Sequence, residues 1–257
     1  MTRGHRTTVV AGAVVPAVLL TGCSGAAPNR AEPARPLIVF AAASLQGAFD
    51  ELAQDFAAQH PEHPIDPIVY DGSQALATQI MDGADVDVMA FANEASLEPV
   101  TDAGAADAGT IFATNTLQIA VAPGNPLGVE GLDALADPGL SVVLCAEEVP
   151  CGAASHTLLD DAGIAARPVS EETNVTSVAA RVANGEADAG LVYATDIASA
   201  DGALDGVTPS NADAAVNRYP ITISSTAESP DAAEAFVDLV MSDDGQKTLH
   251  KHGFEQP

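Results

Sequence analysis

Leu37-Ile-Val-Phe-Ala-Ala-Ala-Ser44 is an apolar run that ends on small residues and a hydroxyl. Apolar residues follow at helical spacing from Leu45 to Ala57, so Ser44 stands where the N-cap of a helix is expected. The stretch therefore predicts a strand that delivers a hydroxyl to a helix start. Such a start offers unpaired N–H groups and the positive end of the helix dipole, and small residues leave room there for an anion. Taken alone, the stretch also fits a serine that only caps its helix.

The rest of the chain repeats this unit of strand and helix. The alternation predicts an α/β fold in which parallel sheets are covered by helices. Ligands bind beyond the carboxyl ends of strands in such sheets, which draws attention to Ser44, Ser73, the turn 150–152 and Tyr193. Further strands are expected at 65–70, 85–92, 116–122, 141–145, 190–193 and 219–224, and further helices near 73–80, 94–102, 152–161, 176–183, 230–241 and 246–252.

The N-terminal segment has the pattern of an export signal. Arg3 and Arg6 precede a short apolar run, and Leu20-Thr-Gly-Cys23 follows it. We expect residues 1–22 to be a signal peptide. Cys23 resembles a lipobox cysteine, which predicts lipidation there, a tether over 23–36 and a place on the extracytoplasmic face of the cell membrane. The alternative is an ordinary signal peptide with a chance cysteine.

The charge balance limits the possible partners. The chain has 9 Lys and Arg against 36 Asp and Glu, a formal net charge of −27. Such a surface is a poor partner for nucleic acid. An anionic ligand must therefore be held mostly by neutral donors and helix ends. Arg181 is the one cation that lies close in sequence to the candidate positions.

Five short motifs occur in an order and spacing that resemble the molybdate-binding lipoproteins and periplasmic proteins that supply ABC importers. The resemblance covers residues 37–254. The motifs are Phe40-Ala-Ala-Ala-Ser44-Leu, Tyr70-Asp-Gly-Ser73-Gln, Glu148-Val-Pro-Cys-Gly-Ala153, Gly190-Leu-Val-Tyr193 and Gly245-Gln-Lys with Gly253-Phe254.

The resemblance implies a two-lobed fold that closes on a tetrahedral oxyanion. Each lobe would be a mostly parallel sheet flanked by helices, and two crossover strands would join the lobes. The expected division gives 37–117 and 223–257 to lobe 1 and 118–222 to lobe 2. The implied ligand is molybdate and also tungstate. The implied partner is an importer permease. The protein would act as a monomer, with no cofactor, no protein-bound metal and no catalytic residue.

The same resemblance implies a ligand shell of five residues. Ser44 and Ser73 would donate from hydroxyl and backbone N–H groups of one lobe. Cys151 and Val175 would donate from backbone N–H groups of the other lobe, and the hydroxyl of Tyr193 would complete the shell. A fully deprotonated dianion accepts hydrogen bonds only, so this donor set suits it.

Two alternatives stay open at this point. Sulfate or phosphate is the alternative tetrahedral ligand. Asp71 would favour phosphate if its carboxylate accepts the proton of hydrogen phosphate, whereas an aspartate before Gly-Ser is more often a turn residue that points to water. The family often has serine where this chain has Gln74, so whether position 74 supplies a further donor stays open. A different class is a secreted thiol hydrolase that uses Cys151 and His156. A disulfide between Cys145 and Cys151, which export permits, would remove that nucleophile.

Overall fold

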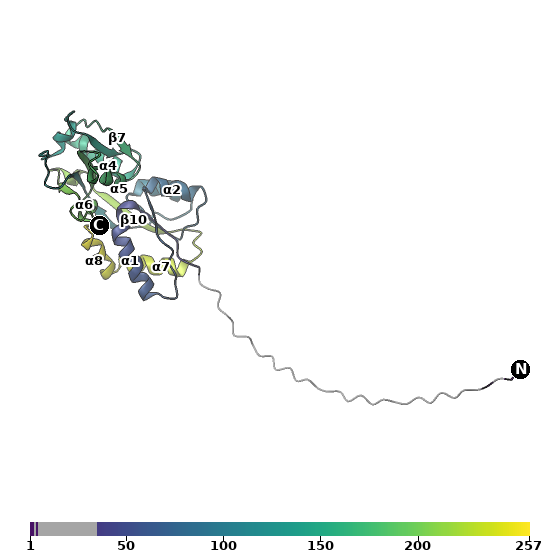
Figure 1. Ribbon diagram of the computed structural model, residues 1–257. Helices are drawn as coiled ribbons and strands as arrows, with labels where there is room; N and C mark the ends of the chain where they lie inside the picture. Colours follow the sequence, from purple (N-terminus) through teal and green to yellow (C-terminus); the bar gives the residue numbers. More distant parts are fainter. Residues whose placement is uncertain (3, 5–34) are drawn as a thin grey trace. The chain divides into compact units, whose positions relative to one another are not determined.

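Two five-stranded sheets, each flanked by helices, form the protein. The computed structural model describes residues 1, 2, 4 and 35–257, and its part from residue 35 onward belongs to one compact unit (Figure 1). The predicted α/β class with two lobes is confirmed. The predicted signal peptide lies mostly outside the described residues. Cys23 and residues 24–34 of the predicted tether also lie outside them.

The first sheet has the strand order β2-β1-β3-β10-β4. β1 is parallel to β2 and β3, whereas β10 is antiparallel to both of its neighbours. The pairing of β10 shifts register between Tyr219 and Pro220, where proline has no N–H to donate. The bounds are β1 Val39–Ala42, β2 Val69–Asp71, β3 Val88–Ala90, β4 Thr110–Asn115 and β10 Asn217–Ile223.

The second sheet has the order β7-β6-β8-β5-β9. β6 is parallel to β7 and β8, and β5 is antiparallel to β8 and β9. The expected parallel pairing holds for β2-β1-β3 and for β7-β6-β8, whereas every pair that includes β10 or β5 is antiparallel. The bounds are β5 Leu117–Val121, β6 Val142–Cys145, β7 Ser170–Glu172, β8 Ala189–Tyr193 and β9 Asp205–Val207.

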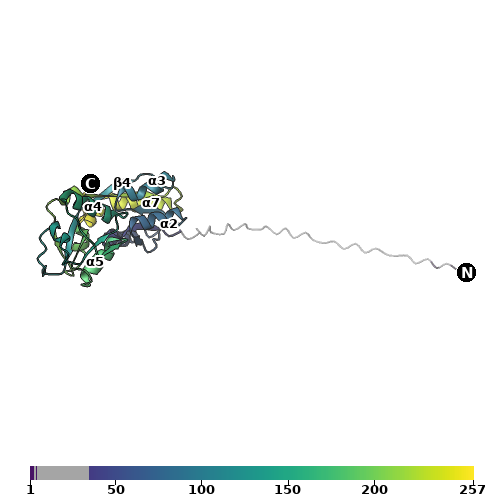
Figure 2. The ribbon, with the colours of Figure 1, turned by 90° about the horizontal axis from the view of Figure 1, so that it is seen from above.

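The helices divide between the two sheets in the same way. Figure 2 shows α4 and α5 on one side and α2, α3 and α7 on the other. The helices are α1 Gln46–Gln59, α2 Ser73–Met81, α3 Glu94–Asp102, α4 Pro150–Ala162, α5 Val175–Ala183, α6 Ala194–Ala198, α7 Pro230–Met241 and α8 Asp243–Lys251; η1 Ala43–Leu45, η2 Leu132–Ala136 and η3 Ala212–Ala214 are 3-10 turns.

The chain crosses between the sheets at two adjacent points. β4 continues into β5 through Thr116, and β10 begins directly after Val216. Asn115 and Asn217 are partners in the pairing of β4 with β10, so the two crossings lie side by side. The expected division gave residues up to 222 to lobe 2, whereas the chain already pairs within the first sheet from Asn217 onward.

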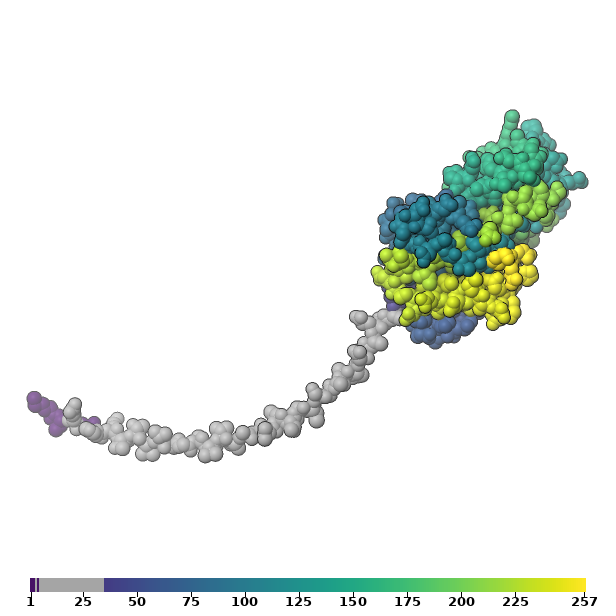
Figure 3. Space-filling view, turned by 180° about the vertical axis from the view of Figure 1, so that it is seen from behind, coloured from purple at the N-terminus to yellow at the C-terminus, as the bar shows by residue number. Residues whose placement is uncertain are grey.

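Both ends of the described fold contribute to the first lobe. Phe49 and Phe56 of α1 each pack edge-to-face against Phe236 of α7, with ring centroids 5.8 and 5.5 Å apart. All three rings are fully buried, and such pairs stabilise beyond their area burial. Figure 3 shows the yellow C-terminal segment beside the blue of the early chain. The first lobe is thus completed only by the last helices.

Candidate ligand-binding site

A small cavity lies between the lobes, at the carboxyl ends of the parallel strands. Its volume is about 20 Å³. Ser44 and Ser73 line it from the first lobe, and Cys151, Val175 and Tyr193 line it from the second. The structure therefore brings all five of the predicted shell residues to one place. The other lining residues are Ala42, Ala43, Asp71, Gly72, Ala92 and Pro150.

Helix starts converge on this cavity because each follows a strand that ends there. β1 leads into η1 and α1, β2 into α2, β6 into α4 and β7 into α5. No side chain caps the starts of η1, α2 or α4. Within the described residues, the backbone N–H groups of Ser73, Cys151 and Val175 donate no hydrogen bond. The cavity is therefore surrounded by free donors and positive dipole ends.

Ser44 does not occupy the N-cap position that the sequence pattern predicted. It lies inside η1, because the chain tightens into a 3-10 turn before α1 begins at Gln46. The N-cap of that turn falls on Ala42, which has no capping group. Ser44 Oγ instead lies 3.0 Å from Tyr219 Oη, a partner 175 residues away.

Ser73 has its acceptor function occupied by the protein. Its Oγ accepts a hydrogen bond of 3.0 Å from the backbone N–H of Ala92, and the side chain is 1 % exposed. The hydroxyl proton is then the part of this group that remains for a ligand. Ser73 is also the first residue of α2, so its hydroxyl and its N–H belong to the same helix start.

Tyr193 brings a buried hydroxyl with no partner. Its side chain is 1 % exposed, and Tyr193 Oη is the one fully buried side-chain polar atom of the described residues without a hydrogen bond. Burial, with Tyr219 and Asp196 nearby, raises its pKa well above the ordinary value, so the group stays protonated. A neutral donor therefore lines the cavity.

Asp196 fixes the backbone of Tyr193. One carboxylate oxygen of Asp196 accepts the Tyr193 N–H at 2.9 Å, at the start of α6. Burial raises the pKa of Asp196 to about 7, although the hydrogen bond from Tyr193 N–H opposes the shift. The carboxyl is therefore half-ionised near neutral pH.

No cation lines the cavity among the residues that the structure describes. Arg181 does not reach it, because its guanidinium is paired with Glu172 and with Glu186, the latter at 3.2 Å. Gln74 does not line the cavity either. Groups of three or more His, Cys, Asp or Glu side chains that would hold a metal are absent from the described part of the chain.

Cys151 is bonded to Cys145 in a disulfide, with 5.7 Å between their Cα atoms. Its sulfur is therefore not a free thiol, and the alternative of a Cys151–His156 nucleophile and base is wrong for this structure. The bridge joins the end of β6 to the first turn of α4. Gly152 lies so close to the Ala146 carbonyl that a Cβ atom would collide with it. The loop is therefore packed directly against this helix start.

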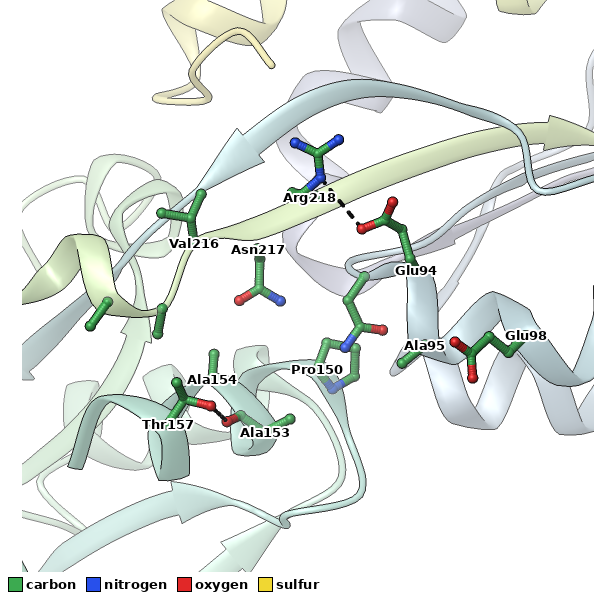
Figure 4. A pocket seen from close by; sticks show the side chains of 13 residues that line it. Glu94, Ala95, Glu98, Pro150, Ala153, Ala154, Thr157, Val216, Asn217 and Arg218 are labelled. Carbon is green, nitrogen blue, oxygen red and sulfur yellow. Dashed lines mark hydrogen bonds and ion pairs between the residues drawn. The ribbon is translucent and has the colours of Figure 1, made fainter. Parts of the chain in front are cut away.

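Wider grooves lie on both sides of the cavity. One of about 450 Å³ lies between α3 and α4, where Arg218 Nε is 3.4 Å from Glu94 Oε2 (Figure 4). The other, of about 470 Å³, carries the carboxylates of Asp50 and Asp196. Ser73, Cys151, Val175 and Tyr193 line the small cavity and neither groove, so the small cavity is the candidate site.

Sequence reasoning missed Tyr219 and Asn115, which contact shell residues or the partners of shell residues. Tyr219 contacts Ser44 and packs its ring edge-to-face on Tyr193 at 6.1 Å. Asn115 donates to Thr195 Oγ1 at 2.8 Å and to Tyr219 Oη at 3.5 Å. These partners are far apart in sequence and have no local pattern. Asp71, which the sequence analysis singled out as a possible proton acceptor, does line the cavity wall.

Comparison with known proteins identifies the family of this chain. Residues 37–255 match the family model described as bacterial extracellular solute-binding protein. The chain belongs to this family. The molybdate-binding protein ModA of Mycobacterium tuberculosis is 39 % identical over 99 % of this solute-binding protein and 98 % of its own length.

Two solved structures share the fold of this solute-binding protein. The periplasmic molybdate-binding protein of Azotobacter vinelandii superimposes with a TM-score of 0.75 at 23 % identity, covering 86 % of this chain and 99 % of its own. The sulfate-binding protein SubI of M. tuberculosis superimposes with a TM-score of 0.71 at 19 % identity, covering 86 % of both chains. No helix in the described residues has the length and apolarity to span a bilayer.

The raised pKa of Asp196 predicts a pH-dependent effect of Asp196→Asn on stability. The unfolded carboxyl ionises near its ordinary pKa of 3.8, and the folded one only near about 7. As the pH rises between these values the unfolded state gains the charge first, so wild-type stability falls. The variant cannot ionise. We expect its Tm relative to wild type to rise from pH 4.5 to pH 8 in thermal unfolding, and an unchanged difference would contradict the assignment.

The disulfide predicts an effect on ligand binding beside its modest effect on stability. Closing so short a loop restricts the unfolded chain by only about 2 kcal/mol. The bridge also holds the turn that presents the Cys151 N–H, so its loss adds ordering cost on binding. We expect Cys145→Ala/Cys151→Ala to bind its oxyanion at least about fivefold more weakly. Calorimetry measures this, and thermal unfolding of the empty variant is the control; unchanged affinity would contradict the role.

Proposed function

We propose that this solute-binding protein captures molybdate outside the cytoplasmic membrane and passes it to an ABC importer. The observation that carries the proposal is the cavity itself, which combines free helix-start N–H groups and a buried, unpartnered tyrosine hydroxyl without any cation. Tungstate, with the same charge and shape, is proposed as a second ligand. Anchoring through a lipid on Cys23 and action as a monomer belong to the same proposal.

The energetics are adequate for such a site. Five charge-assisted hydrogen bonds at about 1.5–3 kcal/mol each contribute roughly 8–15 kcal/mol before association costs are subtracted. A dissociation constant in the micromolar range or below is therefore reasonable. All five donors come from neutral groups, which suits a dianion that has no proton of its own to donate.

Sulfate and phosphate are the competing ligands. The relative at 39 % identity is named for molybdate, whereas the sulfate-binding neighbour at 19 % identity is evidence for the fold alone. This difference favours molybdate. Hydrogen phosphate would need an acceptor, and the carboxylate of Asp71 is the one such side-chain group in the cavity wall, so phosphate is a competitor that the titration must include.

Titration of the mature protein tests the ligand. We expect molybdate and tungstate to bind with micromolar or lower dissociation constants, and sulfate and phosphate to bind at least about a hundredfold more weakly, in parallel isothermal titrations. Molybdate, tungstate and sulfate share their charge and tetrahedral shape, so each serves as a control for the others. Tighter binding of sulfate or phosphate would overturn the assignment to molybdate.

Ser44→Ala tests the shell with little risk to the fold, because Ser44 Oγ contacts only a tyrosine hydroxyl. Loss of one charge-assisted hydrogen bond costs about 1.5–3 kcal/mol, so affinity should fall at least about tenfold. Arg181→Gln is the matched control. Its charge is already neutralised by two glutamates, and we expect at most about a twofold change in calorimetry. The reverse ranking would place the ligand beside Arg181.

A further inference from the structure

We infer that Asp71 and Asn174 form a latch between the lobes that holds them closed around the ligand and slows its release. Asp71 ends β2 in the first lobe, and Asn174 is the residue before α5 in the second. Asn174 Nδ2 donates to Asp71 Oδ1 across the lobe boundary at 3.4 Å. This inference rests on the proposed function and names residues outside the five-residue shell.

The contact is continuous with a close approach of the two backbones. A Cβ atom on Gly72 would collide with the carbonyl oxygen of Thr173, so glycine is required where the lobes meet. Residues 71–72 of one lobe thus abut residues 173–174 of the other. Each pair directly precedes a shell residue, Ser73 or Val175. Closing this contact therefore brings two donor groups to the cavity from opposite sides.

Both side chains of the latch have a second, fixed role. Asp71 Oδ1 also accepts the Gly72 N–H, which orients the carboxylate. Asn174 Oδ1 caps α5, since it accepts from Ser177 N at 2.9 Å and Ser177 Oγ at 3.0 Å. The amide of Asn174 has one end on the cap and the other end on Asp71. Little side-chain freedom is left to lose when the lobes close.

Asn174→Asp isolates the latch from the cap. Aspartate caps a helix as well as asparagine, so α5 should keep its start. The new carboxylate cannot donate to Asp71 and faces it with the same charge. We expect radiolabelled molybdate to leave this variant at least about tenfold faster than it leaves wild type, measured by rapid filtration after dilution.

Asn93→Asp is the matched control for the added charge. Asn93 caps α3 with the same geometry, accepting from Ser96 N at 2.9 Å and Ser96 Oγ at 2.6 Å. It also adjoins a cavity residue, Ala92, but makes no hydrogen bond to the second lobe among the described contacts. We expect its release rate to stay within about threefold of wild type. Equal release from N93D and N174D would overturn the latch.

A readout without ligand separates this inference from the proposed function. If wild type binds none of the four oxyanions, the proposed function fails. Small-angle scattering of the ligand-free proteins then still tests the latch. We expect a larger radius of gyration for N174D than for N93D, and equal radii would overturn the inference.

Discussion

The arrangement of the rest of the site depends on the buried, unpartnered hydroxyl of Tyr193. A buried polar group without a partner costs about 1–3 kcal/mol, so it persists only where the surroundings hold it firmly. Asp196 holds its backbone, and the ring of Tyr219 packs against its own. Tyr219 belongs to the first lobe and in turn contacts Ser44 of that lobe. One unsatisfied donor is thereby connected to both crossings of the chain and to the first helix start.

Recognition by dipoles in place of cations is consistent with the composition. A lysine in the cavity would attract any anion, whereas fixed N–H and hydroxyl donors accept only a ligand whose oxygens meet them in position. The strongly acidic surface would also compete for such a lysine, as Glu172 and Glu186 do for Arg181. Parallel strands solve the geometric part of the problem, because their carboxyl ends place several helix starts at one edge.

Local signals made much of the fold predictable. α3 and α7 were expected at their observed bounds, and in the structure Asn93 caps the first while Pro230 opens the second. Strand β4 was missed, because it runs into β5 with only Thr116 between them and has no turn signal to separate the two. Short edge strands such as β7 and β9 were missed for want of an apolar pattern.

The candidate site was predictable only in part. The five shell residues follow strands or open helices, and a family resemblance named them, so their positions were within reach of the sequence. Tyr219 and Asn115 were not, since each acts through a partner about a hundred or more positions away. Asp71 was noticed as a carboxylate near an anion site. Its role needed the position of Asn174, which only the packing of the lobes provides.

The way the first lobe is closed has a consequence for how the protein is made. Its earliest strand and helix bury their apolar faces against Phe236 and Phe254, which are synthesised only after all strands of the second lobe. Until they appear, the segment from Leu37 to Phe56 has no complete core to join. The core of the first lobe is therefore completed only after the second lobe has all of its strands.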